Sequence, residues 1–162
     1  MAKDKTPKQP AEKNAEGSLL AENRKARFNY HIIETFEAGL VLQGTEVKAC
    51  RAGKANLTDG YAAFRGSELF IQNLHINEYS HGNRENHSPR RTRKLLLNRS
   101  EIVKLLTLLK SGMSLVPLKM YVKNSYIKIL LGLAKGKKAY DKREDLKKKD
   151  ADREIARSAS RK

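Results

Sequence analysis

The sequence has no tryptophan and only one cysteine, Cys50. A single cysteine cannot form an internal disulfide, which is typical of proteins in reducing compartments. No stretch approaches the roughly 20 apolar residues of a membrane-spanning helix, and no basic helix has a strong apolar face, so no membrane partner is expected. The first residues lack the apolar region of a signal peptide, and we therefore expect a cytoplasmic location.

Acidic residues are scarce relative to basic ones. The 162 residues include 34 Lys and Arg against 18 Asp and Glu, a formal net charge of +16. This surplus is larger than solubility alone requires and indicates a polyanionic partner. Basic side chains bind nucleic acid by neutralising its phosphates and releasing counterions, so nucleic acid is the favoured partner. The length allows one domain with tails.

Residues that carry enzyme chemistry form no recognisable site. We expect Cys50 to be a small buried residue of a short helix rather than a nucleophile. The four histidines show no metal-ligand spacing and have no cysteine partners. The segment beginning at Gly132 lacks the spacing and the Ser or Thr of a Walker loop. The sequence therefore predicts no catalytic residue, no metal, no cofactor and no enzymatic activity.

A change of composition near residue 134 divides the chain. The segment 126–134 places Ile127, Ile129, Leu131 and Leu133 at period two, which predicts a half-buried strand. From 135 to 162 the chain has 12 Lys or Arg and 6 Asp or Glu, and 12 − 6 gives a net charge of +6 on 28 residues. We predict a disordered leader over 1–18, a domain over 19–134 and a basic C-terminal tail over 135–162.

The tail has two interpretations, an arm that reaches a second partner or a solvated disordered segment. The pairs Glu144–Lys148 and Asp145–Lys149 are spaced to favour a helix. No apolar face is available to dock such a helix, so we predict that it becomes helical when bound.

The remaining pattern predicts a mainly β fold with flanking helices. Strands are expected over 28–37, 40–43, 61–65, 68–76, 115–122 and 126–134, with Pro117 at a sheet edge. Helices are expected over 46–52, capped by Thr45, and from the Asn98–Glu101 capping box onward, with an apolar stripe of Ile102, Leu105, Leu106, Leu109 and Met113. Segment 19–27 is either a helix or extended, and 77–92 is a mobile loop. About six short strands with two to three helices fit an OB-like antiparallel barrel, because closure removes free edges.

Several residues could contact RNA, each with a plainer alternative. Lys48 and Arg51 lie three apart and could face one phosphate ridge, or form a solvated helix face. Glu37 could accept from a base amino group or form a surface ion pair. A dense basic run could follow a phosphate backbone: Arg90, Arg91, Arg93 and Lys94. Three strand aromatics could stack on unpaired bases or belong to the core: Tyr61, Phe64 and Phe70.

Four motifs occur in an order that closely resembles one family. They are Glu37-Ala-Gly-Leu-Val-Leu-Gln-Gly-Thr-Glu-Val-Lys48, Arg51-Ala-Gly-Lys-Ala-Asn56, Arg91-Thr-Arg-Lys-Leu-Leu-Leu97 and Gly132-Leu-Ala-Lys-Gly-Lys-Lys-Ala-Tyr-Asp-Lys-Arg143. Together they resemble the SsrA-binding protein family over about residues 23–157.

The resemblance implies an OB-type barrel and a bacterial cytoplasmic factor of trans-translation. Such a factor binds the transfer-RNA-like domain of transfer-messenger RNA (tmRNA, or SsrA RNA) and brings it to 70S ribosomes stalled without a stop codon. Its tail enters the empty messenger channel of the small subunit, along ribosomal RNA. Alanyl-tRNA synthetase and elongation factor Tu would be indirect partners through tmRNA.

Carried over by motif, the resemblance implies two sets of residues. Those forming or supporting the tmRNA-binding surface are Asn23, Arg24, Lys25, Glu37, Lys48, Arg51, Lys54, Arg91, Arg93, Lys94 and Leu95. Those meeting the decoding region are Lys135, Lys137, Lys138, Tyr140, Asp141, Lys142, Arg143, Lys147 and Lys148. Tyr140 stands where some members have His. Two rivals remain from the residues alone, a structural ribosomal protein and an RNA-processing enzyme.

Overall fold

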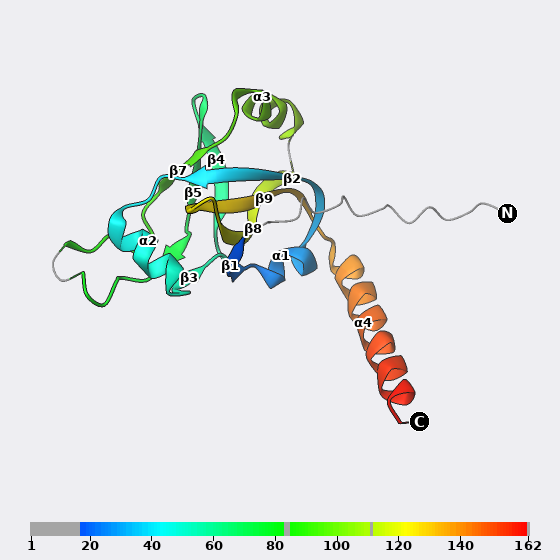
Figure 1. Ribbon diagram of the computed structural model, residues 1–162. Helices are drawn as coiled ribbons and strands as arrows, with labels where there is room; N and C mark the ends of the chain where they lie inside the picture. Colours follow the sequence, from blue (N-terminus) through cyan, green and yellow to red (C-terminus); the bar gives the residue numbers. More distant parts are fainter. Residues whose placement is uncertain (1–16, 83–84, 111, 162) are drawn as a thin grey trace.

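A computed structural model describes residues 17–82, 85–110 and 112–161 (Figure 1). Residues 1–16 of the predicted leader lie outside this range. The elements are β1 (Ser18–Glu22), α1 (Arg24–Asn29), β2 (Tyr30–Leu40), α2 (Gly44–Arg51), β3 (Ala55–Asn56), β4 (Tyr61–Arg65), β5 (Glu68–Gln72), β6 (His75–Ile76), β7 (Arg93–Leu96), α3 (Arg99–Leu108), β8 (Met113–Lys123), β9 (Tyr126–Gly136) and α4 (Ala139–Ala159).

Six of the described strands close into an antiparallel barrel. The order β8-β4-β5-β7-β2-β9 is completed by the pairing of β9 with β8, while β1 adds to β8 and β3 pairs with β6 in a small separate sheet. The long β8–β9 hairpin turns at Asn124 and Ser125, which both have positive φ (50° and 65°), as a tight two-residue hairpin requires. The expected OB-like fold with flanking helices is confirmed.

Strand β9 is buried on both faces, so the prediction of a half-buried strand is wrong. Ile129 and Leu131 face the main core inside the barrel. Leu130 and Ala134 point the other way, into a second cluster that includes Ala26 of α1. Helix α1 therefore covers a strand face that the alternating pattern had assigned to solvent.

The boundaries near α1 and β8 also differ from the prediction. Segment 19–27 contains both a strand and the start of α1, and Phe28 lies in that helix rather than in β2. Pro117 is buried inside β8, paired opposite Leu131 at a register shift, not at a sheet edge. The shift explains how a residue without an amide hydrogen is tolerated there.

The caps and burial of helices α2 and α3 agree only partly with the prediction. Helix α2 is capped by Gln43 and Glu46, so the predicted Thr45 cap is wrong, and the Thr45 hydroxyl instead bonds His87 Nδ1 at 2.9 Å. Helix α3 has the predicted Asn98–Glu101 capping box, but its predicted stripe is only partly correct. Leu105 is buried whereas Leu106 is half exposed, and the helix ends at Leu108.

Helix α4 projects from the barrel as a separate rod that ends at the C-terminus (Figure 1). None of its residues is buried. The prediction that it forms only on binding stays a prediction. In the described part of the chain, no helix is both long and apolar enough to cross a membrane.

Candidate nucleic-acid interface

Helix α2 presents a basic side on one flank of the barrel. Its residues Ala49 and Cys50 are buried against the core, whereas Lys48 and Arg51 are exposed, as is Lys54 just beyond the helix. The Arg51 guanidinium donates to the Ser125 carbonyl at 3.3 Å, which links α2 to the β8–β9 turn. The three cations lie within seven residues of chain and are available to phosphate.

A buried ion cluster fixes α2 against β7. Glu46 is fully buried and accepts from Arg93 Nε at 2.6 Å and from Arg91 Nη2 at 2.5 Å. Arg93 is also fully buried, and it donates to the Leu74, Arg91 and Pro89 carbonyls at 2.7, 3.1 and 3.1 Å. Arg93 therefore has its donors satisfied inside the protein and supports the surface instead of touching RNA, while Arg91 keeps a partly exposed edge.

The charge of Glu46 is maintained by its donors. Desolvation raises the pKa of this carboxyl, but the hydrogen bonds from Arg91, the Gln43 amide and Arg93 outweigh it and bring the pKa below its ordinary value. The carboxylate is consequently ionised at neutral pH and neutralises a guanidinium that has no contact with water. Glu46 is a structural residue that sequence reasoning missed, although it stands inside the first motif.

Next to this cluster, β7 contributes one buried and one accessible residue. Leu95 is buried in the main core. Lys94 is half exposed and pairs with Glu68 at 2.5 Å. Lys94 therefore offers a charge at the surface, whereas Leu95 contributes only to core packing.

Glu37 lies on β2 within reach of cations from the β8–β9 hairpin. Its carboxylate accepts from the Tyr121 hydroxyl and, at 3.3 Å, from Lys123 Nζ. Desolvation raises the pKa of Glu37, but Tyr121 and Lys123 outweigh it and lower the pKa overall. Desolvation and the bond to Glu37 both raise the pKa of Tyr121. The carboxylate is thus a fixed acceptor, half exposed, among positive charges.

Asn23 joins three parts of the fold. Its Oδ1 accepts from the Ala26 amide at 3.2 Å, capping α1. Its Nδ2 donates to the carbonyls of Pro117 at 3.0 Å and Leu57 at 3.4 Å. Asn23 is buried, while the next residues, Arg24 and Lys25, are exposed. Asn23 therefore positions two surface cations.

The strand aromatics have different surroundings. Phe64 packs against the main core, and Phe70 lies under the Arg65 guanidinium, 5.6 Å from its ring centre. Tyr61 is 41% exposed and donates to Gln72 Oε1 at 3.0 Å. Of these three residues, only Tyr61 is exposed, and Phe64 and Phe70 are partly buried.

The root of the tail is fastened to α1 and β2. Lys137 Nζ pairs with Asp145 at 2.5 Å and donates to the Arg27 carbonyl at 3.0 Å. Asp141 lies 3.8 Å from His31 Nε2, and Lys142 Nζ lies 5.9 Å from the Phe28 ring centre. These contacts set the direction in which α4 leaves the barrel.

The other predicted tail residues are exposed. They are Lys135, Lys138, Tyr140, Arg143, Lys147 and Lys148. In Figure 1, α4 and α2 lie on opposite sides of the barrel. The α2 cations and the tail therefore lie on separate surfaces, whereas Arg24 and Lys25 lie on α1, which contacts the root of the tail.

The described residues contain no group of three or more His, Cys, Asp or Glu side chains able to hold a metal ion. Cys50 is buried, as predicted, and burial raises the pKa of its thiol to about 12. A thiol with that pKa stays protonated at neutral pH and is a poor nucleophile.

Comparison with known proteins agrees with the motif resemblance. The sequence model of the SmpB protein family matches residues 20–161. An SsrA-binding protein of Anoxybacillus flavithermus is 59% identical over 144 residues, covering 88% of this chain and 94% of that protein. The SsrA-binding protein of Bacillus subtilis is 58% identical over 143 residues, 88% of this chain and 92% of that one.

Among solved structures, one chain described as "tmRNA-SmpB: a journey to the center of the bacterial ribosome" is similar to this fold with a TM-score of 0.63 and 51% sequence identity. The match covers 74% of this chain and 85% of that chain. The motifs, the six-stranded barrel and these relatives agree, and the chain belongs to the SmpB family of SsrA-binding proteins.

Proposed function

We propose that this protein is an RNA-binding factor of trans-translation that acts with tmRNA on the stalled bacterial ribosome. The observation that carries the proposal is the separation of two surfaces on one chain. A barrel flank bears exposed cations on α2, and an exposed arm, α4, leaves the opposite side (Figure 1). Such a molecule is built to hold one RNA and reach another.

The barrel is the proposed partner of the transfer-RNA-like domain of tmRNA. Lys48, Arg51 and Lys54 would contact phosphates directly, because they are exposed. Arg91, Lys94 and the half-exposed Glu37 would add to this surface, and the buried Arg93 and Leu95 would support it. Asn23 would instead position α1. Arg24 and Lys25 add charge beside α1.

The tail is the proposed partner of the decoding region. Residues 135–162 carry a net charge of +6, from 12 basic and 6 acidic residues. The exposed side chains of this segment would enter the empty messenger channel, along small-subunit RNA. We further propose that the factor works in the bacterial cytoplasm, and that it meets alanyl-tRNA synthetase and elongation factor Tu only through tmRNA.

Truncation after Lys138 tests the division of labour. The truncation keeps all of β9, whose residues to Gly136 pair with β2. We expect binding of tmRNA to stay near the wild-type value and tagging of nascent chains on stalled ribosomes to be lost. A collapse of tmRNA binding in a variant that still folds would contradict the two-surface proposal.

A charge reversal on α2 tests the barrel surface. Replacing Lys48 and Arg51 by Glu should weaken tmRNA binding. Each phosphate contact favours binding by releasing counterions from the RNA, and this gain is lost with the contact. The matched control is Lys147→Glu with Lys148→Glu, the same charge change on the tail. Unchanged affinity of the α2 variant would remove this helix from the interface.

A further inference from the structure

Side-chain hydrogen bonds join described residues of the loop between β6 and β7 to one another, to β6 and to α2. The Asn86 side chain accepts from the Tyr79 amide at 2.9 Å and donates to the Tyr79 carbonyl at 2.8 Å. His87 is buried, with Nε2 at 2.9 Å from the Ile76 carbonyl and Nδ1 at 2.9 Å from the Thr45 hydroxyl. Since a carbonyl only accepts, His87 donates from Nε2, and its Nδ1 accepts the hydrogen bond of the Thr45 hydroxyl. His87 thus joins the described part of the loop to α2.

This arrangement places two aromatic rings beside the basic side of α2. The centres of the Tyr79 and His81 rings are 5.4 Å apart and the ring planes are tilted by 46°. Lys48 Nζ lies 5.4 Å from the Tyr79 ring centre. A cation at this distance from a ring interacts favourably with its face.

Packing of the core does not account for the Tyr79 ring. It belongs to neither of the apolar clusters that hold the barrel and α1 together. Lys48, for its part, has no carboxylate within ion-pair distance among residues 17–82, 85–110 and 112–161. A partly buried ring outside the core and an ammonium group with no carboxylate partner among the described residues are therefore held next to each other.

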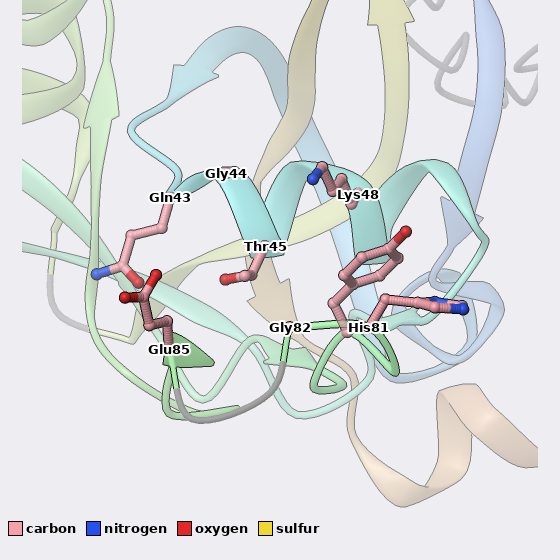
Figure 2. A pocket seen from close by; sticks show the side chains of 8 residues that line it. Gln43, Gly44, Thr45, Lys48, His81, Gly82 and Glu85 are labelled. Carbon is pink, nitrogen blue, oxygen red and sulfur yellow. The ribbon is translucent and has the colours of Figure 1, made fainter.

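The two rings line an open cleft between α2 and the loop. In Figure 2, Gln43 and Glu85 lie toward one end of this cleft and Lys48 and His81 toward the other. The end with Glu85 repels a phosphate, whereas the end with Lys48 attracts one. The polar groups of Gln43 and Glu85 are suited to the donor and acceptor edges of a base.

We propose that Tyr79 and His81 form a stacking platform for an unpaired base of the RNA bound by the barrel, with Lys48 neutralising the phosphate of that nucleotide. The proposal rests on the proposed function and adds Tyr79 and His81 to the RNA-binding surface. Sequence-specific proteins recognise unpaired RNA bases by this combination of aromatic stacking and phosphate neutralisation. Duplex RNA keeps its bases stacked inside the helix and offers no base to the platform.

Affinity measurements on ring variants test the platform. Wild type, Tyr79→Ala, Tyr79→Phe and His81→Ala are titrated with the transfer-RNA-like domain at fixed salt, and Tyr79→Phe is the matched control. Tyr79→Ala should bind about 5- to 150-fold more weakly, the range found for loss of one base stack. Tyr79→Phe keeps the ring and should bind like wild type. Thermal melts of each variant verify that it is folded.

A salt series separates stacking from charge. Tyr79→Ala should leave the slope of log affinity against log salt concentration unchanged, because it removes no cation. Lys48→Ala removes one phosphate contact and should reduce the magnitude of that slope by about 1. An equal loss of affinity by Tyr79→Ala toward a fully paired RNA duplex would overturn the platform.

A fluorescent reporter gives an independent readout. Because the chain has no Trp, Tyr79→Trp provides a unique fluorophore. Its emission should be quenched by RNA with unpaired bases and unaffected by duplex.

Two failures are distinguishable. If wild type itself shows no preference for the transfer-RNA-like domain, the proposed function fails. If wild type binds it and Tyr79→Ala binds equally well, only the platform fails. Intact RNA binding by Tyr79→Ala with loss of ribosome association would also overturn the platform, since it would make the loop a docking surface for protein.

Discussion

The buried pair of Glu46 and Arg93 allows one prediction to be worked out from the structure. In Glu46→Gln the side chain keeps its size, so no cavity forms and the change is one of charge. Arg93 is fully buried and Glu46 is the carboxylate that it pairs with. Removing one partner of a buried ion pair costs about 3–5 kcal/mol, because the other charge stays buried without compensation.

The matched control is Glu68→Gln. Glu68 pairs with Lys94 at 2.5 Å, but both side chains are well exposed, at 49% and 39%. A pair screened by water to this extent contributes about 0–1 kcal/mol. The two variants therefore make the same chemical change in a buried and in a solvated setting.

Both variants are measured by urea unfolding and by thermal melts, each followed by far-ultraviolet circular dichroism. Glu46→Gln should lower the free energy of unfolding by about 3–5 kcal/mol and, for a chain of this size, the Tm by roughly 6–20 °C. Glu68→Gln should stay within about 1 kcal/mol of wild type. Equal stability of Glu46→Gln and wild type would refute the assignment of the cluster as the tie between α2 and β7.

The same carboxylate predicts a pH dependence. The pKa of Glu46 is lower in the folded chain than its ordinary value. Its contribution is therefore complete above the unfolded pKa of about 4.3 and is lost as pH falls through the folded pKa. Wild type should lose stability in this acid window more steeply than Glu46→Gln, and parallel pH profiles would count against the pair.

Two further changes test the supports of the other surfaces. Asn23→Ala removes the α1 cap and two hydrogen bonds to backbone carbonyls. The free energy of unfolding should fall by about 1–3 kcal/mol, while the folded fraction still binds tmRNA. An unfolding curve like that of wild type would contradict this role of Asn23. Asp145→Asn breaks the ion pair with Lys137 at the root of α4. Amide hydrogen exchange over 137–146 should then be faster than in wild type and in the control variant Asp152→Asn. Unchanged exchange would show that this ion pair does not hold the root of α4.

Local sequence signals predicted the parts of the fold that depend on neighbouring residues. The Asn98–Glu101 capping box spans four residues. The alternation of apolar residues likewise predicted the face of β9 that points into the barrel. Its four residues are all in the core: Ile127, Ile129, Leu131 and Leu133. Each signal needs only a few consecutive residues to be read.

Long-range packing decided what the sequence could not reveal. The outer face of β9 is buried because Ala26, more than 100 residues earlier, brings α1 over it. Arg93 stands in a basic run that looks solvated, and its burial depends on Glu46, 47 residues away. A lone acidic residue on a basic helix gives no sign of such a partner, which is why Glu46 was missed and Arg93 was placed among the phosphate-binding cations.

We propose that the barrel recognises the shape of one RNA and does not bind polyanions in general. The most direct test is binding of the purified protein to the transfer-RNA-like domain of tmRNA, with alanine transfer RNA as competitor, across a salt series. A steep salt dependence is expected for both RNAs from the net charge of +16. We expect a strong preference for the transfer-RNA-like domain that survives high salt, and equal affinity for the two RNAs would contradict recognition of shape by the barrel.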